Sequence, residues 1–206
     1  MSSFVGHSLT GLTTYAIAHQ WQADREPKRD RPDWFWLFWL LVVSSIPDID
    51  HLITVLRIQT ENGNIRTTHS FVGTLILPIL TIVALWFWGQ RGKVFAIKSV
   101  QVLVVGLSHL LLDLLTGVPS LALFYPFSLE TFKLPFGLLP SAGQLHPLNY
   151  YLYRNLFIEV GVLIPFFASL ILSVRTIPRL LNRRFAIASG FVVSACFAIW
   201  AASLSR

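Results

Sequence analysis

The sequence predicts an all-α integral membrane protein, a polytopic bundle of about six helices with a long structured outer loop. Hydrophobic residues make up 54% of the 206 residues, and charged residues only 13%. A typical soluble domain carries about 25% charged residues. Five segments have the length and apolar character of a membrane-crossing helix, and a sixth, more polar segment is a further candidate. At this chain length we expect one membrane-embedded domain, residues 1–206.

Five of these segments are apolar throughout and are predicted as spans at 34–53, 70–89, 95–115, 155–174 and 185–203. The first segment, 3–21, is more polar, because His7 and several Ser and Thr residues interrupt its apolar side chains. Two placements are open for it. It spans the membrane with its polar residues inside the bundle, or it lies in the interface as an amphipathic helix. The charge distribution favours a span.

The positive charges predict the orientation of the helices. With both termini outside, most of the 16 Lys and Arg residues fall in the inner loops, namely Arg25, Lys28, Arg29, Arg31, Arg91, Lys93, Lys98, Arg175, Arg179, Arg183 and Arg184. Such residues accumulate on the cytoplasmic side of membrane proteins. The net charge of +6 therefore reflects topology, and the expected partner is a lipid bilayer rather than nucleic acid.

Aromatic residues agree with this orientation. Trp34, Trp36 and Trp39 begin one span, and Trp86 and Trp88 end the next, all on the inner side. Tryptophan is enriched at membrane interfaces, so these clusters are expected to form an interfacial belt.

The longest connection, about 116–153, lies outside. Its prolines and glycines oppose regular structure, whereas its many Leu and Phe residues predict that it packs on the bundle or on the lipid surface. A long structured loop beside a site commonly acts as a lid or a binding wall.

Histidines and carboxylates gather at the outer ends of the predicted spans. They are His7, Asp48, Asp50, His51, His69, His109, Asp113 and Glu159. Ionisable side chains at membrane depth are costly and mark functional sites. His109 and Asp113 are four residues apart and share one face of a helix. Pro47 disfavours helix just before it, so the bent segment presents Asp48 and Asp50 inward together.

Mixed His and Asp ligands suit zinc, manganese or iron, and zinc is the first expectation. The candidate metal ligands are His7, Asp50, His51, His69, His109 and Asp113. A metal held in this way lowers the pKa of a water and polarises a carbonyl or phosphoryl oxygen.

Three further residues are catalytic candidates. Asp48 and Glu159 are candidate general bases, and Arg66 is a candidate to hold a phosphate-like group. Structural explanations remain open beside these roles. Asp48 is also a candidate helix N-cap, Arg66 an ordinary interfacial anchor, and His69 an incidental residue at a helix start.

These residues resemble a known group, the predicted membrane-bound metal-dependent hydrolases, also described as LexA-binding, inner-membrane-associated hydrolases. The resemblance covers about residues 1–130. It rests on His7 before Gly11, Pro47-Asp48-Ile49-Asp50-His51, Arg66-Thr67-Thr68-His69-Ser70, His109-Leu-Leu-Leu-Asp113 and the following Leu114-Leu115-Thr116-Gly117-Val118 with Pro126-Phe127-Ser128. The resemblance implies a location in the plasma (inner) membrane.

The ligand order is also similar to that of bacterial zinc-dependent phospholipases C. That similarity implies metal roles for Asp50, His69, His109 and Asp113, with His7 as a further candidate.

The sequence thus predicts a membrane-bound metal-dependent hydrolase that uses metal-activated water. Its expected substrate is a phosphoester or ester of a lipid or lipid-linked molecule, reached from the extracytoplasmic side, because a site at interface depth meets lipid head groups first.

Two other classes of protein stay open, an ion-coupled membrane transporter and a non-catalytic membrane protein stabilised by its metal. Transporter sites usually lie at the midplane within inverted repeats, whereas these candidates lie near one surface. The oligomeric state is left open.

Overall fold

A computed structural model describes residues 3–23, 32–51, 53, 56–60, 63–117, 120–141, 148–174 and 181–204. The α-helices in these ranges are α1 (Phe4–Ala23), α2 (Trp34–Ser45), α3 (Phe71–Phe87), α4 (Gly92–Leu115), α5 (Tyr150–Val174) and α6 (Leu181–Ser203). Two 3₁₀ helices, η2 (Ile46–His51) and η4 (Thr67–His69), flank an antiparallel hairpin of β1 (Arg57–Thr60) and β2 (Gly63–Arg66). The predicted helical bundle is confirmed, with the hairpin as an unforeseen addition.

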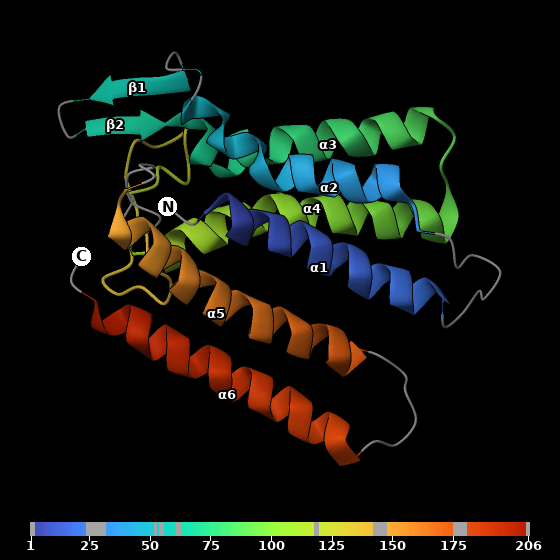
Figure 1. Cartoon of the computed structure of the whole chain (residues 1–206). Helices are drawn as coiled ribbons and strands as arrows, with labels where there is room; N and C mark the ends of the chain where they lie inside the picture. Colours follow the sequence, from blue (N-terminus) through green and yellow to red (C-terminus); the bar gives the residue numbers. More distant parts are fainter. Residues whose placement is uncertain are drawn as a thin grey trace.

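Successive helices run in opposite directions, so both chain ends and the hairpin lie at one end of the bundle (Figure 1). We call this the hairpin end. Helix α1 packs against α2, α4 and α5, while α3 packs on α4 and α6 packs on α5. The first helix is therefore a central member of the bundle. Its polar residues His7, Thr10 and Thr13 are buried against the other helices, which explains its lower hydropathy.

The outer surface of the bundle is strongly apolar. Helices α4, α5 and residues Arg183–Ser203 of α6 are long and apolar enough to cross a membrane, and α3 is a shorter apolar helix. Phe35, Trp88 and Ile199 have exposed fractions of 75%, 78% and 71%. Such a surface would be an aggregation hazard in water but suits contact with lipid chains.

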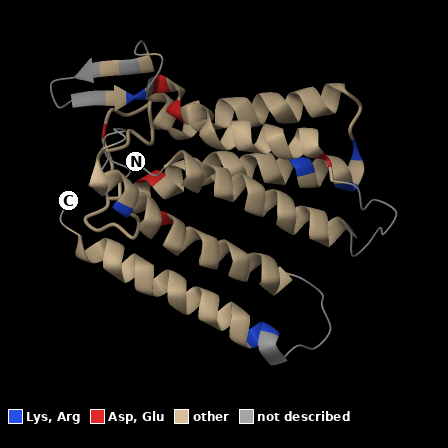
Figure 2. Cartoon of the chain, in the orientation of Figure 1, with Lys and Arg blue, Asp and Glu red and all other residues tan. Residues whose placement is uncertain are grey.

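Charge divides the two ends of the bundle. Most of the acidic residues that the structure describes lie at the hairpin end (Figure 2). The beginnings of α4 and α6, which carry Lys93 and Arg183, lie at the opposite end (Figure 1).

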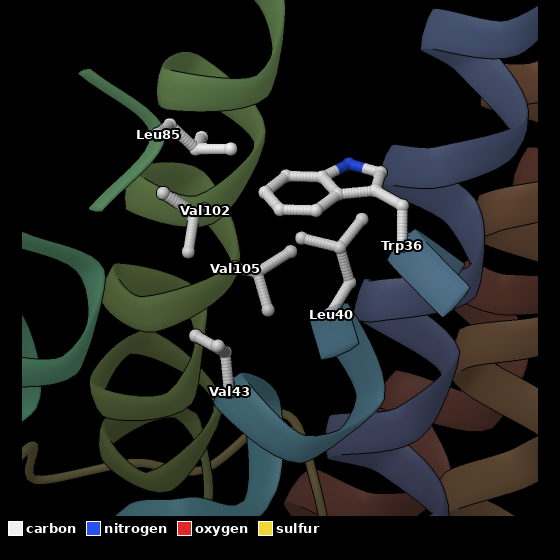
Figure 3. Packing of buried hydrophobic residues seen from close by; sticks show 6 residues of the cluster. All are labelled: Trp36, Leu40, Val43, Leu85, Val102 and Val105. Carbon is white, nitrogen blue, oxygen red and sulfur yellow. The ribbon is translucent and has the colours of Figure 1, made fainter. Parts of the chain in front are cut away.

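Helices α2, α3 and α4 meet in an apolar core. Its buried members are Trp36, Leu40, Val43, Leu85, Val102 and Val105 (Figure 3). The indole N–H of Trp36 donates to Oε1 of Gln101 over 2.9 Å, and the Gln101 amide donates to the Thr14 carbonyl over 3.4 Å. Polar groups inside a membrane bundle need such internal partners. These two bonds tie α1, α2 and α4 together.

The buried position of Trp36 corrects one expectation. Its side chain is only 5% exposed, so it is a core residue and not part of an interfacial belt. Trp34 and Trp88, by contrast, are 70% and 78% exposed.

Helix α2 ends earlier than predicted. The α-helix stops at Ser45, and the chain continues as η2 through Pro47. Proline lacks an N–H and its ring opposes a regular helical turn, which explains this change. The short η2 then carries Asp48 and Asp50 across the hairpin end.

The described part of the long connection between α4 and α5 packs on the bundle, as predicted. Leu121, Leu123 and Leu139 are buried. The N–H of Leu139 donates to the Leu115 carbonyl over 3.0 Å, and the N–H of Phe71 donates to the Leu123 carbonyl over 2.9 Å. The connection thereby covers the hairpin end beside the ends of α3 and α4.

Candidate metal centre

Five ionisable side chains from four segments converge at the hairpin end, and we call them the His/Asp cluster. They are His7 of α1, Asp48 of η2, His69 of η4, and His109 and Asp113 of α4. All are fully buried except Asp48, whose side chain is 22% exposed. Burial of so many ionisable groups is unfavourable unless they are paired or bind a metal.

Four members of the cluster offer ligand atoms with spacings that suit one tetrahedral ion. These atoms, from Asp48, His69, His109 and Asp113, lie within 4.8 Å of one another. Nε2 of His69 is 3.1 Å from Nε2 of His109, 3.3 Å from Oδ1 of Asp48 and 3.2 Å from Oδ2 of Asp113. Nε2 of His109 is 3.8 Å from each of those oxygens. Ligands about 2.0–2.1 Å from a tetrahedral zinc are about 3.4 Å apart, so the donor set fits such an ion.

His7 faces the other oxygens of the same two carboxylates. Its Nε2 is 3.8 Å from Oδ2 of Asp48 and 3.7 Å from Oδ1 of Asp113. Neither ring nitrogen of His7 has a hydrogen-bond partner among the described residues. The ring is instead held by stacking on His109, with centroids 3.8 Å apart. Asp48 and Asp113 therefore each face imidazole nitrogens through both carboxylate oxygens.

The end of α2 fixes the orientation of His109. Nδ1 of His109 is 2.8 Å from the Ser44 carbonyl, which can only accept, so Nδ1 carries the proton and Nε2 is left as the ligand atom. In a 3₁₀ turn this carbonyl would accept from residue 47, but Pro47 has no N–H. A hydrogen bond from the second imidazole nitrogen is the usual way to orient a metal-binding histidine. The sequence analysis did not identify Ser44 as the partner of His109. Pro47 could have indicated it, because a proline leaves the carbonyl three residues before it without a helical N–H partner.

His69 is held at the start of α3. Its Nδ1 lies 3.0 Å from the Thr68 hydroxyl, and its Nε2 faces Asp48 and Asp113. Burial alone would lower the pKa of His69, but hydrogen bonds to Asp113 and Asp48 outweigh it and raise that pKa above its ordinary value. His69 thus has the acidic surroundings that also favour a bound cation.

Asp50 lies beside the cluster and pairs with Arg66. The guanidinium of Arg66 donates through Nε and Nη2 to both carboxylate oxygens of Asp50. The same Nη2 is 3.3 Å from Oδ1 of Asp48. Asp50 Oδ2 is 4.0 Å from Nδ1 of His69, the nitrogen that faces away from the cluster centre. The structure therefore places Asp48, the predicted base, among the ligand atoms and Asp50 next to them.

Glu159 is buried at a different position. Both of its carboxylate oxygens accept the N–H of Ser3, over 2.9 and 3.1 Å, and the Ser3 hydroxyl accepts the N–H of Gly6. A carboxylate is favoured at the positive N-terminus of a helix. Glu159 thus fixes the beginning of α1, one turn before His7. It is not in the group of four ligand donors found among the described residues.

Two further histidines are not placed. The side chain of His51 and the whole of His146 lie outside the described part of the chain.

An apolar helical bundle with a buried His/Asp cluster at one end defines an integral membrane protein with a potential metal site. Residues 1–202 match the family model described as YdjM inner membrane protein, and the chain belongs to this family. No curated protein and no solved structure matches the chain. The family description agrees with the predicted inner-membrane location; it names no reaction.

Proposed function

We propose that the protein is a metal-dependent hydrolase of the inner membrane whose site is the His/Asp cluster. The observation that carries this proposal is the convergence of three Nε2 atoms on the same two carboxylates, Asp48 and Asp113. Mixed imidazole and carboxylate ligands of this kind suit zinc, with manganese or iron as alternatives. A divalent metal bound there would supply Lewis acidity and a water of lowered pKa.

The cluster has donors for two metal positions that share both carboxylates. His69 and His109 face one oxygen of each carboxylate, and His7 faces the other oxygen of each. The first position has four protein donors, and the position at His7 has three. A catalytic metal requires such an open ligand position, so we assign the reaction to the His7 side.

The remaining polar residues would support the reaction. Asp50 holds the Arg66 guanidinium against Asp48, which fixes the carboxylate that both positions share. Arg66 also brings a positive charge to the edge of the cluster, where it would attract a phosphate-like group. The role of Glu159 as a general base stays a prediction, since its carboxylate binds Ser3.

The substrate class follows from the location of the cluster. It lies at one end of a lipid-facing bundle, and in a bilayer it would therefore lie near the depth where head groups meet hydrocarbon. We propose a phosphoester or ester of a lipid or lipid-linked molecule as the substrate. The beginnings of α4 and α6, which carry basic residues, lie at the opposite end of the bundle. The positive-inside rule then directs the cluster to the extracytoplasmic side.

One observation favours a second candidate function. Four protein donors around one tetrahedral ion form a closed site, which is typical of a structural metal. Under this alternative, one metal joins η2, η4 and α4 and no hydrolysis occurs. The two functions differ in the number of bound ions and in turnover.

The test is hydrolysis by the purified full-length protein in nanodiscs, loaded separately with zinc, manganese or iron. Phosphatidic acid serves as the phosphoester substrate and diacylglycerol as the carboxylic ester substrate. We expect phosphate or fatty acid release from one of them by the wild type and none by Asp113→Ala. Metal-loaded wild type that releases neither product would contradict hydrolysis and favour the structural role.

A further inference from the structure

A groove between α1 and α2 leads from the outside of the bundle to the His/Asp cluster. It encloses about 480 Å³, and Asp48 is one of its lining residues. Its apolar lining is formed by Phe4, Phe38, Leu41, Val42, Ile46 and Ile49. Its volume is in the range of pockets that hold small molecules. Asp48 therefore belongs both to the groove and to the cluster.

The two helices touch beside the groove. A Cβ atom on Gly11 would lie only 3.2 Å from the Leu40 carbonyl oxygen and 3.3 Å from the Leu41 side chain. Phe4 and Ser8 precede this contact on α1, and Val42 and Ile46 follow it on α2. Most of the lining residues thus lie on the side of this contact that adjoins the cluster, and Phe38 extends the groove past the contact along α2.

The groove opens toward the lipid-facing surface. Phe4 and Phe38, which line it, are 66% and 62% exposed. In a bilayer these exposed rings would contact hydrocarbon, so a chain that enters the groove comes from the membrane and not from water. The polar residue at its cluster end, Asp48, is the one cluster member with an exposed side chain, at 22%.

We propose that this groove binds one acyl chain of a phosphate-bearing membrane lipid and thereby places the lipid head group at Asp48. This inference rests on the proposed function for the fate of the head group, but chain binding itself needs no turnover. The occupant is an acyl chain because the lining is mostly apolar and the mouth of the groove would contact hydrocarbon. At the other end, the groove reaches the His/Asp cluster, where a bound cation would contact the phosphate of the head group. Lateral entry also explains how a substrate reaches a cluster that is otherwise fully buried.

The test is photo-cross-linking of the full-length protein in nanodiscs that contain phosphatidic acid with a diazirine on one acyl chain. We expect labelling of Phe38, Leu41 and Val42 to exceed that of the exposed α6 residues Val192 and Ile199 by roughly tenfold. The variant Val42→Trp fills the groove and abolishes this excess. The matched control Val104→Trp, at a 48% exposed position on α4, leaves it unchanged.

Labelling that simply follows exposure, or a Val42→Trp variant that retains its metal and is labelled like wild type, would overturn the proposal. Metal content shows that Val42→Trp is folded. The two proposals fail separately. Groove labelling without hydrolysis refutes the proposed reaction alone, whereas hydrolysis with uniform labelling refutes the groove alone.

Discussion

The imidazole rings of His7 and His109 stack with their planes inclined by only 14°. The two residues come from α1 and α4, and each directs Nε2 toward Asp113, over 3.7 and 3.8 Å. They approach different oxygens of that carboxylate. The proposed pair of metal positions, one beside His109 and one beside His7, rests on this arrangement.

Replacing His7 with Ala should therefore remove one metal position and leave the other. Among the described residues, His7 supplies the imidazole that faces Oδ2 of Asp48 and Oδ1 of Asp113. The variant loses this imidazole, while His69, His109, Asp48 and Asp113 remain. We expect metal analysis to show about one ion per chain instead of two, together with loss of hydrolysis. An equal metal content in wild type and His7→Ala would refute the two-position assignment.

Glu159→Gln separates a catalytic role from an anchoring role. The amide oxygen of Gln still accepts the Ser3 N–H, so residue 159 would still hold the beginning of α1 in place. We expect hydrolysis to fall less than about tenfold. Loss of a general base costs about 10²–10⁴-fold, so a decline of that size with normal metal content would identify Glu159 as the base.

Gly73→Ala should weaken metal binding from outside the cluster. A Cβ at this position would lie 2.9 Å from Cα of Thr68 and would also collide with the Thr67 carbonyl oxygen. The backbone of η4 must then move, and His69 moves with it. We expect metal affinity, measured by competition with a chelator, to fall about 10–100-fold.

Val72→Ala is the control for this variant, because Val72 is the neighbouring residue on α3 and is 42% exposed. It should bind metal as the wild type does. If Gly73→Ala also does so, the glycine is not required for the position of His69.

Trp36→Phe tests the polar bond in the core of the bundle. The change removes the indole N–H that Gln101 accepts, in a region distant from the hairpin end. We expect a loss of about 0.5–2 kcal/mol in the free energy of unfolding, measured by denaturation in detergent. Metal content should be unchanged. A variant as stable as wild type would show that this bond contributes little.

The sequence predicts the bundle well, because hydropathy and loop charge act over whole segments. It also predicts that His7, His69, His109 and Asp113 lie at the same end of the bundle. One local feature was beyond it. The 3₁₀ geometry of η2 decides that Asp48 faces the cluster while Asp50 faces Arg66, and residue spacing does not reveal this choice.

Long-range packing accounts for the other features of the structure that the sequence did not predict. Trp36 is buried because Gln101 of α4 lies opposite it, and Glu159 binds Ser3 because α5 packs beside α1. The groove at Val42 likewise depends on how α1 and α2 approach each other at Gly11. None of these pairs is adjacent in the chain, so composition and periodicity carry no signal for them.

Metal analysis of the protein, purified without chelators, tests the central claim most directly. Wild type should retain tightly bound divalent metal, and His109→Ala and Asp113→Ala should lose it. His19→Ala, which changes a histidine near the opposite end of α1, should keep the wild-type content. Metal-free wild type after incubation with zinc, manganese and iron, or equal metal in all four proteins, would contradict a metal site in the His/Asp cluster.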